Sequence, residues 1–420
     1  MGSVAITGVG LVVPGHTCAE QLFFSLSNGV SLLRRDKNLE ELGVHGVTSG
    51  YIDRSDIQAI EDANPEVSGN NTSTAGKMAY HAAKSSMSMA AIDFSIYPRE
   101  RSGLFLGFNK NAVTIEHLYS MWSRFDEGSS TLNPAKCDDK KTLSNLRQNQ
   151  VTELISKYCG HNGHVNVHSS ACTAGASAIT SGFRRIRSGE YDMALCGASE
   201  EATQPLMQFG FHKIGAMANT QFNSPEEVSR PFDKDRTGCV LADGAAFLVL
   251  EDVEKAMQRR VKPLAYIAGA SRQSEAYKLT STAPDGHLYE ACMQAALDDA
   301  GLLASDIDHI SAHGTSTVRN DAAESRAIYK MFGARPTVTS TKSALGHSLA
   351  ASGAIEVVLS VIALHQQKVL PTLNYHMPRE DEPSLNIKSK VFNQEVNVVL
   401  SNSFGFGGEN CSIVITKEKS

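Results

Sequence analysis

The sequence has 420 residues, of which 41% are hydrophobic and 20% charged, a length that suffices for two domains or one large two-part α/β core. Its net charge of −6 at pH 7 argues against non-specific binding to nucleic acid or to an anionic membrane. Its eight cysteines form no CxxC motif and no zinc-finger spacing, which argues against a structural metal site and fits a reducing compartment.

The N-terminal segment carries no lysine or arginine before Arg34, so it lacks the charged start of a signal peptide. No apolar stretch reaches the length of a membrane span, since the run GAIEVVLSVIAL at 353–364 contains Glu356. We therefore expect a cytoplasmic protein that does not insert into a membrane.

Short β-branched runs alternate with longer helix-like segments along the chain. Buried strands are predicted at 4–10, 102–107, 165–170, 192–199 and 245–251. Helices are predicted at 74–91 and 173–186, and the alternation resumes after residues 261–271. Such alternation predicts a mostly parallel sheet with helices on its faces.

Two segments of the chain resemble each other. HVNVHSSACTAGASAI and PTVTSTKSALGHSLAASGAI both run from an extended segment, through Ser and Thr, into a helix rich in small residues. VAITGVG and LAYIAGAS begin the two regions in a similar way. The repeat predicts two copies of one α/β unit, at 1–260 and 261–420.

Cys172 stands where the apolar run before it gives way to small residues. A lone cysteine is most often a buried and inert core residue. At the start of a helix, however, unpaired backbone N–H groups favour a thiolate and could stabilise an oxyanion on an attached acyl group. Cys172 is therefore either a core thiol or a nucleophile, and the rest of the chain has to decide.

Two histidines, His313 and His347, occupy similar strand-to-helix contexts, each beside a glycine that allows close backbone approach. Between Ser343 and Leu364 the only charged side chain is Glu356, and a buried carboxylate needs a partner. Lys342, just ahead of that helix, is the natural one. GFGG at 405–408 could offer backbone N–H groups to a ligand but matches no nucleotide-binding pattern.

Four motifs occur in the order SSACTAG, HGTST, TKSALGHSLAASGA and SNSFGFGG. In this order and at these intervals they resemble the elongating β-ketoacyl-acyl carrier protein synthases of the thiolase superfamily, the fatty-acid and type II polyketide ketosynthases. RPFDKDRTG and ADGAA resemble further segments, so the likeness spans nearly the whole chain. Initiating synthases use a Cys–His–Asn set, and His347 argues against that class.

The resemblance implies a thiolase-like fold with α-β-α-β-α layers. The half at 1–260 would carry the nucleophilic cysteine, and the half at 261–420 the two histidines and the glycine-rich loop. The implied reaction is decarboxylative Claisen condensation of an acyl-enzyme thioester with malonyl-acyl carrier protein. It gives 3-oxoacyl-acyl carrier protein, CO2 and free carrier protein, in fatty-acid or type II polyketide or polyene elongation, without a cofactor or a metal ion.

The resemblance also implies a role for individual residues. Cys172 would carry the acyl chain, and its backbone N–H would form the oxyanion hole together with that of Phe404. His313 and His347 would hydrogen-bond the malonyl thioester carbonyl. Lys342 would belong to the catalytic set, with Glu356 as its ion-pair partner, and Thr315 and Thr317 would contact the pantetheine arm. The gate and acyl pocket would be formed by Phe404, Gly405, Phe108 and Asn109.

Three segments depart from the family pattern. VRND follows HGTST where Pro and Gly-Asp are usual, and Asn320 tolerates the left-handed backbone that such a turn could need. Cys239 stands where the family usually has a phenylalanine that lines the malonyl site, so the shape of that pocket is expected to differ. Glu409 stands beside the glycine loop where a threonine is usual.

The expected partner is an acyl carrier protein. Basic residues that often dock it are missing between Arg54 and Lys77, so docking falls to Lys213 or to the group Arg184, Arg185 and Arg187. The group is more simply a solvated helix face. We expect a pathway-specific carrier or a partner subunit that supplies part of the docking surface.

The expected assembly is a homodimer, or a heterodimer with a subunit like the chain-length factors. A chain-length-factor-like role for this chain itself is the alternative function, although such subunits usually lack the nucleophilic cysteine. A cysteine hydrolase would need only one base histidine, and degradative thiolases place their nucleophile much nearer the N-terminus than Cys172.

Overall fold

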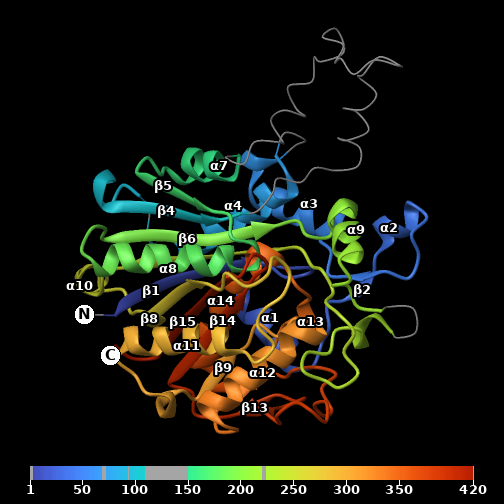
Figure 1. Ribbon diagram of the computed structural model, residues 1–420. Helices are drawn as coiled ribbons and strands as arrows, with labels where there is room; N and C mark the ends of the chain where they lie inside the picture. Colours follow the sequence, from blue (N-terminus) through green and yellow to red (C-terminus); the bar gives the residue numbers. More distant parts are fainter. Residues whose placement is uncertain (1–2, 69–71, 93, 109–149, 220–223, 420) are drawn as a thin grey trace.

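The computed structural model describes residues 3–68, 72–92, 94–108, 150–219 and 224–419 (Figure 1). The strands are β1 (Val4–Val12), β2 (Arg34–Arg35), β3 (Thr48–Ser49), β4 (Ser102–Gly107), β5 (His164–His168), β6 (Met193–Glu200), β7 (Gly244–Glu251), β8 (Ala265–Ser274), β9 (His309–Ser311), β10 (Thr337–Thr339), β11 (Lys368–Val369), β12 (Asn386–Ile387), β13 (Phe392–Asn393), β14 (Val398–Phe404) and β15 (Glu409–Thr416). The five strands predicted from β-branched runs are thus present within a few residues of their expected bounds.

The main sheet has 11 strands in the order β12-β10-β9-β14-β15-β8-β1-β7-β6-β4-β5. Counted outward from the β1/β8 pair, the two halves repeat one arrangement: β1, β7, β6, β4, β5 on one side and β8, β15, β14, β9, β10 on the other. Parallel and antiparallel pairs also occur at equivalent places in the two halves. The weak repeat in the sequence therefore reflects a real repeat of topology.

The prediction of a mostly parallel sheet was wrong for the middle of the sheet. Every neighbouring pair from β14 to β6 is antiparallel, and the parallel pairs lie outside them. A parallel pair needs a crossover connection. The turn at 405–408 instead joins β14 directly to β15, and β6 and β7 likewise pair as antiparallel neighbours.

The helices are α1 (Ala19–Ser27), α2 (Lys37–Glu41), α3 (Arg54–Ala63), α4 (Thr74–Met89), α7 (Gln150–Cys159), α8 (Ala174–Arg187), α9 (Pro205–Lys213), α10 (Val253–Gln258), α11 (His287–Ala300), α12 (Val318–Phe332), α13 (Lys342–Leu345) and α14 (Ser352–Gln366). Helix α4 packs on the outer face of one half-sheet, and α11 on the outer face of the other. Helices α8 and α14 lie between the half-sheets (Figure 1). The layers are therefore α-β-α-β-α, as predicted.

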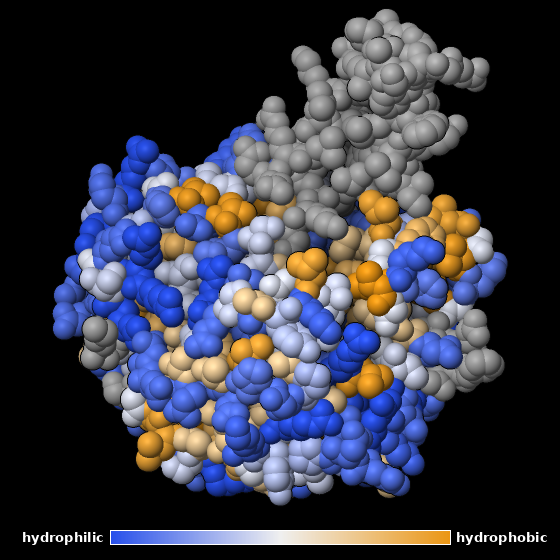
Figure 2. Space-filling model, in the orientation of Figure 1, coloured by the Kyte–Doolittle hydropathy of each residue, from blue (hydrophilic) through white to orange (hydrophobic). Residues whose placement is uncertain are grey.

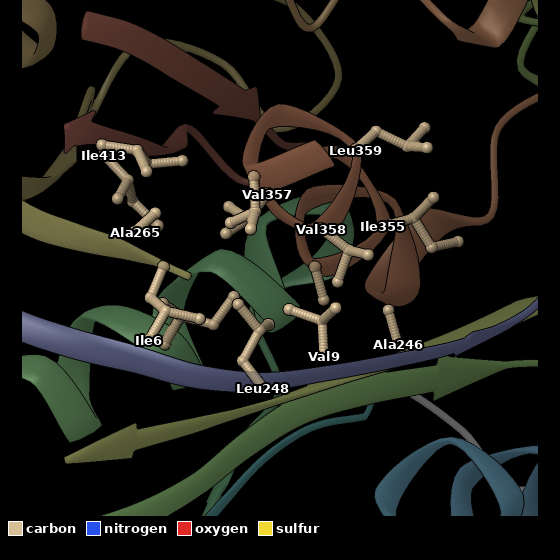
Figure 3. Close-up of a cluster of buried hydrophobic side chains, with 14 of the residues drawn as sticks. Ile6, Val9, Ala246, Leu248, Ala265, Ile355, Val357, Val358, Leu359 and Ile413 are labelled. Atoms are coloured by element: carbon tan, nitrogen blue, oxygen red, sulfur yellow. The ribbon is translucent and has the colours of Figure 1, made fainter. Parts of the chain in front are cut away.

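The two central helices are buried because both faces meet a sheet or each other. Figure 3 shows Val357 and Val358 of α14 in one cluster with Ile6, Val9 and Leu248 of the neighbouring strands. Residues Leu349–Gln366 are long and apolar enough to cross a membrane, but 89% of this window is buried inside the fold. Its apolar composition is thus explained by its place in the core.

The repeat positions the site. Helix α8 follows β5 in the first half, and α14 follows β10 and the short helix α13 in the second. Cys172 comes just before α8, and His347 just before α14. Two equivalent strand-to-helix connections therefore deliver these residues to the same end of the central helix layer.

Strand β5 was expected to be buried, but it lies at the edge of the sheet and is partly exposed. It ends the sheet order beside β4, and its valines Val165 and Val167 are 37% and 43% exposed. The β-branched run correctly predicts a strand, but such a run cannot tell an internal strand from an edge whose apolar face lies at the surface.

Candidate active site

Cys172 sits on a sharp turn between β5 and α8. The turn is the short 3₁₀ segment Ala171–Thr173, and Ala171 adopts a φ of 48°, a left-handed conformation that L-residues rarely take. The Cys172 side chain is 5% exposed. This connection from strand to helix projects the sulfur toward the second half of the chain rather than into the core of its own half.

His347 is hydrogen-bonded to the cysteine. Its Nε2 lies 3.1 Å from the Cys172 Sγ, and its Nδ1 lies 2.9 Å from the Oγ of Ser352 in α14. The hydroxyl fixes the orientation of the ring. A thiol in contact with a held imidazole is the arrangement that nucleophilic catalysis by cysteine needs.

His313 completes the group. Its ring meets that of His347 edge to face, with centroids 5.3 Å apart and planes at 82°. Its Nδ1 is buried and has no hydrogen-bond partner among the described residues. The sequence prediction that Cys172, His313 and His347 come together is consistent with this geometry.

Lys342 contacts the backbone of His313. Its Nζ donates a hydrogen bond of 2.8 Å to the His313 backbone carbonyl and forms an ion pair with Glu356. Both side chains of the pair are 3% exposed. The predicted Lys342–Glu356 pair is therefore present, and it is anchored to the loop that carries His313.

Burial governs the protonation of these groups. It raises the pKa of Cys172 to about 12, although the Lys342 ammonium and nearby backbone N–H groups oppose that rise. Burial, together with Lys342, holds the pKa values of His313 and His347 well below their usual range. Burial therefore favours a neutral thiol and neutral imidazoles in the free site. The backbone N–H groups lower the pKa of Cys172, as the position at the helix start predicted, but burial has the larger effect.

The backbone N–H groups at the sulfur come from Cys172 itself and from Phe406. The prediction had named Phe404 as the second donor. Phe404 is the last residue of β14, and its ring stacks on Tyr289 with centroids 3.7 Å apart. The turn after Gly405 then brings the Phe406 N–H to the thiol. The sequence SFGF alone does not tell which of its two phenylalanines supplies this N–H.

A cavity of about 390 Å³ opens onto the three residues. Its walls include Thr315, Thr317, Phe404 and Gly405, as the resemblance implied, and also Phe406. Phe108 does not line it and packs instead in the core cluster beneath β4. Asn109 lies outside the described residues.

The departures from the family pattern also fall near this cavity. Cys239 lines it and belongs to the same buried cluster as Cys172, and burial raises the pKa of its thiol to about 12. Asn320 lines the cavity too, but from within α12, so it does not use the left-handed backbone that was expected of it. Ser316, four residues earlier, has the positive φ of 67°.

Glu324 was missed by sequence reasoning. Its carboxylate accepts hydrogen bonds of 2.8 Å from the backbone N–H groups of His313 and Gly314. Asp321 does the same for Thr315 and Ser316, at 3.0 and 3.1 Å. The signal was present, since two acidic residues closely follow HGTST at the start of an otherwise amphipathic helix.

The three central residues could hold a metal ion by donor type, since their ligand atoms lie within 4.8 Å of one another. The Cys172–His347 hydrogen bond already occupies two of those atoms, and the Lys342 ammonium lies close by. The charge and the hydrogen bond both disfavour a cation at this place.

The chain matches two family profiles, described as beta-ketoacyl synthase, N-terminal domain, over residues 1–256, and beta-ketoacyl synthase, C-terminal domain, over residues 264–376. A curated relative is 3-oxoacyl-[acyl-carrier-protein] synthase 2 of Rhizobium meliloti (strain 1021), 37% identical over 70% of this chain and 68% of the relative.

Two solved structures are also similar, each at 26% identity and covering 99% of both chains. One is a type II polyketide ketosynthase, bound to the hexaketide, in complex with its acyl-carrier protein, with a TM-score of 0.86. The other is the ishigamide ketosynthase/chain length factor, with a TM-score of 0.85. The profiles, the curated relative and the shared layers together establish that the chain belongs to the β-ketoacyl synthase family.

Proposed function

We propose that this ketosynthase elongates an acyl chain by decarboxylative Claisen condensation, with Cys172 as the acyl-carrying nucleophile. The observation that carries the proposal is the 3.1 Å contact between Cys172 and His347 inside a cavity that His313 also lines. A fully formed Cys–His–His set disfavours the alternative of a chain-length-factor-like subunit with little activity of its own.

In the first step the Cys172 sulfur attacks the carbonyl carbon of an acyl thioester on the carrier. The thiol proton passes to His347, and the backbone N–H groups of Cys172 and Phe406 hold the oxyanion. The bond to the carrier sulfur then breaks and that sulfur takes the proton. The enzyme is left with an acyl-cysteine and the carrier with a free thiol.

In the second step a malonyl thioester binds with its carbonyl oxygen near the two imidazoles. The bond to the carboxylate breaks, CO2 leaves, and its electron pair forms an enolate that hydrogen bonds from His313 and His347 stabilise. The enolate carbon attacks the acyl carbonyl, and the bond to Cys172 breaks. The thiolate that leaves takes up one proton from water, delivered through His347, which contacts the sulfur. The product is a 3-oxoacyl thioester, and the residues named suffice without a cofactor.

The test combines intact-protein mass spectrometry with product analysis, using malonyl carrier and a panel of acyl carriers. We expect acyl mass on Cys172 in the wild type and none in Cys172→Ala. His313→Ala should still acylate but release CO2 slowly, whereas His347→Ala should impair both steps because His347 contacts the sulfur. Absence of acyl transfer to Cys172 with every carrier and partner subunit would refute the proposal.

The carrier is proposed to dock beside α9. Phe211 and Ile214 line the cavity, and Leu206, Phe209 and Ile214 are 46%, 44% and 51% exposed. Figure 2 shows apolar side chains gathered in this region. Lys77 is buried and paired with Glu61, so it does not replace the basic residues missing between Arg54 and Lys77.

We therefore infer that docking is mainly apolar, with Lys213 at the end of α9 as a basic contribution, and that it suits a pathway-specific carrier. Phe209→Ser should raise the KM for the cognate carrier, and Phe24→Ser, a 71% exposed residue on α1, should not. Preference for the housekeeping carrier would contradict this inference.

The proposed assembly is a homodimer, or a heterodimer with a chain-length-factor-like subunit, formed along the exposed edge strand β5.

The seven described cysteines are all free thiols, which fits the reducing cytoplasm predicted from the sequence.

A further inference from the structure

The side chain of Asn320 links Tyr289 to the acidic residues that shape the catalytic loop. The Tyr289 hydroxyl donates a hydrogen bond of 3.0 Å to the Asn320 Oδ1. The Asn320 Nδ2 in turn donates to Asp321 at 3.1 Å and to Glu324 at 3.4 Å. A neutral amide is suited to this place because it supplies two donors to two carboxylates and an acceptor to a hydroxyl.

The two carboxylates hold the loop at 313–316. Together they accept all four backbone N–H groups of that loop. The loop needs such support because Gly314 and Ser316 both have positive φ, 36° and 67°. Asp321 and Glu324 are themselves fully buried, so their positions depend on the few donors that reach them.

A second route runs through the aromatic rings. Tyr289 is 4% exposed and stacks on Phe404 with the planes at 8°. Phe404 meets the His313 ring nearly edge-on, with centroids 6.0 Å apart and planes at 67°. Tyr289 is thus linked to the His313 ring through Phe404. It is linked to the His313 backbone N–H through Asn320 and Glu324.

We infer that Tyr289 and Asn320 act together as positioning residues that hold His313 in place for the decarboxylation step. The kinetic part of the inference, slower decarboxylation in the variants, rests on the proposed function. The structural part, that the two residues hold the loop at 313–316, does not. It also accounts for the VRND segment, because an asparagine at 320 gives Tyr289 a partner that a glycine there could not provide.

Tyr289→Phe is the most informative variant, since it keeps the ring on Phe404 and removes only the hydroxyl. Asn320→Ala removes the link at its centre. Tyr329→Phe, on the exposed side of α12, is the matched control. Acylation of Cys172, CO2 release from malonyl carrier, and amide hydrogen exchange of a peptide covering 312–317 are measured for each.

We expect CO2 release at saturating malonyl carrier to fall about tenfold in both variants, with acylation within about twofold of wild type. Exchange at 313–316 should accelerate, and the double variant should resemble the worse single variant because both residues act through one link. The control should match wild type in all three measurements.

Wild-type exchange in both variants would overturn the inference, as would equal loss of acylation and CO2 release, the mark of general destabilisation. If the wild type releases no CO2 with any carrier, the proposed function fails. The exchange rates then still decide whether Tyr289 and Asn320 hold the loop.

Discussion

The buried thiol of Cys172 is the residue on which the chemistry depends. Cys172 is only 5% exposed, and such burial strengthens the hydrogen bonds that would hold an oxyanion but also disfavours the free thiolate. The contact with His347 resolves this conflict, because the proton can leave the sulfur during attack rather than before it. Neutral imidazoles are required for that transfer, and burial keeps both histidines neutral.

The raised pKa predicts how Cys172 reacts with a small alkylating agent. Below a pKa of about 12 the thiolate fraction grows about tenfold for each pH unit. Iodoacetamide labelling of Cys172, followed by peptide mass spectrometry, should therefore accelerate through pH 10 without a plateau. A plateau near pH 7 would show instead that the resting site holds a thiolate.

The Lys342–Glu356 pair should matter for stability as well as for the site. Glu356→Ala leaves a buried ammonium without its counter-charge, which should lower the free energy of unfolding by about 3–5 kcal/mol. Lys342→Met with Glu356→Leu should restore most of that loss without restoring CO2 release, since His313 then lacks its contact from Lys342.

Arg185→Ala is the control for this comparison. Its ion pair with Glu190 has side chains 46% and 43% exposed, so its loss should cost less than about 1 kcal/mol. Urea unfolding of the four proteins checks the series. Equal losses for Glu356→Ala and Arg185→Ala would contradict a special role for the buried pair.

Among the elements, those with strong local patterns were predictable. The β-branched runs predict β1, β4, β6 and β7, and small residues predict the close-packed helix α8. Whether a strand is an edge, as β5 is, depends on neighbours far along the chain. The same limit applies to Phe404 and Phe406, because only the geometry of the turn decides which N–H faces the sulfur.

Close packing of the central helices has a direct test at Gly175 in α8. A Cβ there would lie 2.7 Å from the Ala350 carbonyl oxygen and 3.0 Å from the Ala198 Cβ. Gly175→Ala should therefore destabilise the protein by about 1–3 kcal/mol, because backbone cannot yield as a side-chain tip can.

Gly210→Ala is the matched substitution in α9, where a Cβ meets nothing within 4 Å. It should stabilise the protein by about 0.5–1 kcal/mol through helix propensity alone. Thermal unfolding of both variants measures the contrast. A stabilised Gly175→Ala would mean that the helices are not in the tight contact described.

On the scale of the whole molecule, the repeated halves explain why the site forms where it does. Each half brings one strand-to-helix connection to the central layer, so neither half alone holds both Cys172 and His347. The four motifs made this convergence predictable, since each stands at the end of a strand. The sheet's outer edge at β5 then lies one short turn from Cys172.

That proximity makes the edge strand the place to test the assembly. Val167→Lys puts a charge on an apolar position that is 43% exposed in the isolated chain, and an interface along β5 would have to bury it. The dimer, or the complex with a co-expressed partner subunit, should dissociate at least tenfold more readily by light scattering at graded concentrations. Leu303→Lys, at an exposed residue (71%) far along the chain, should leave association unchanged. An unaltered assembly in Val167→Lys would place the interface elsewhere on the molecule.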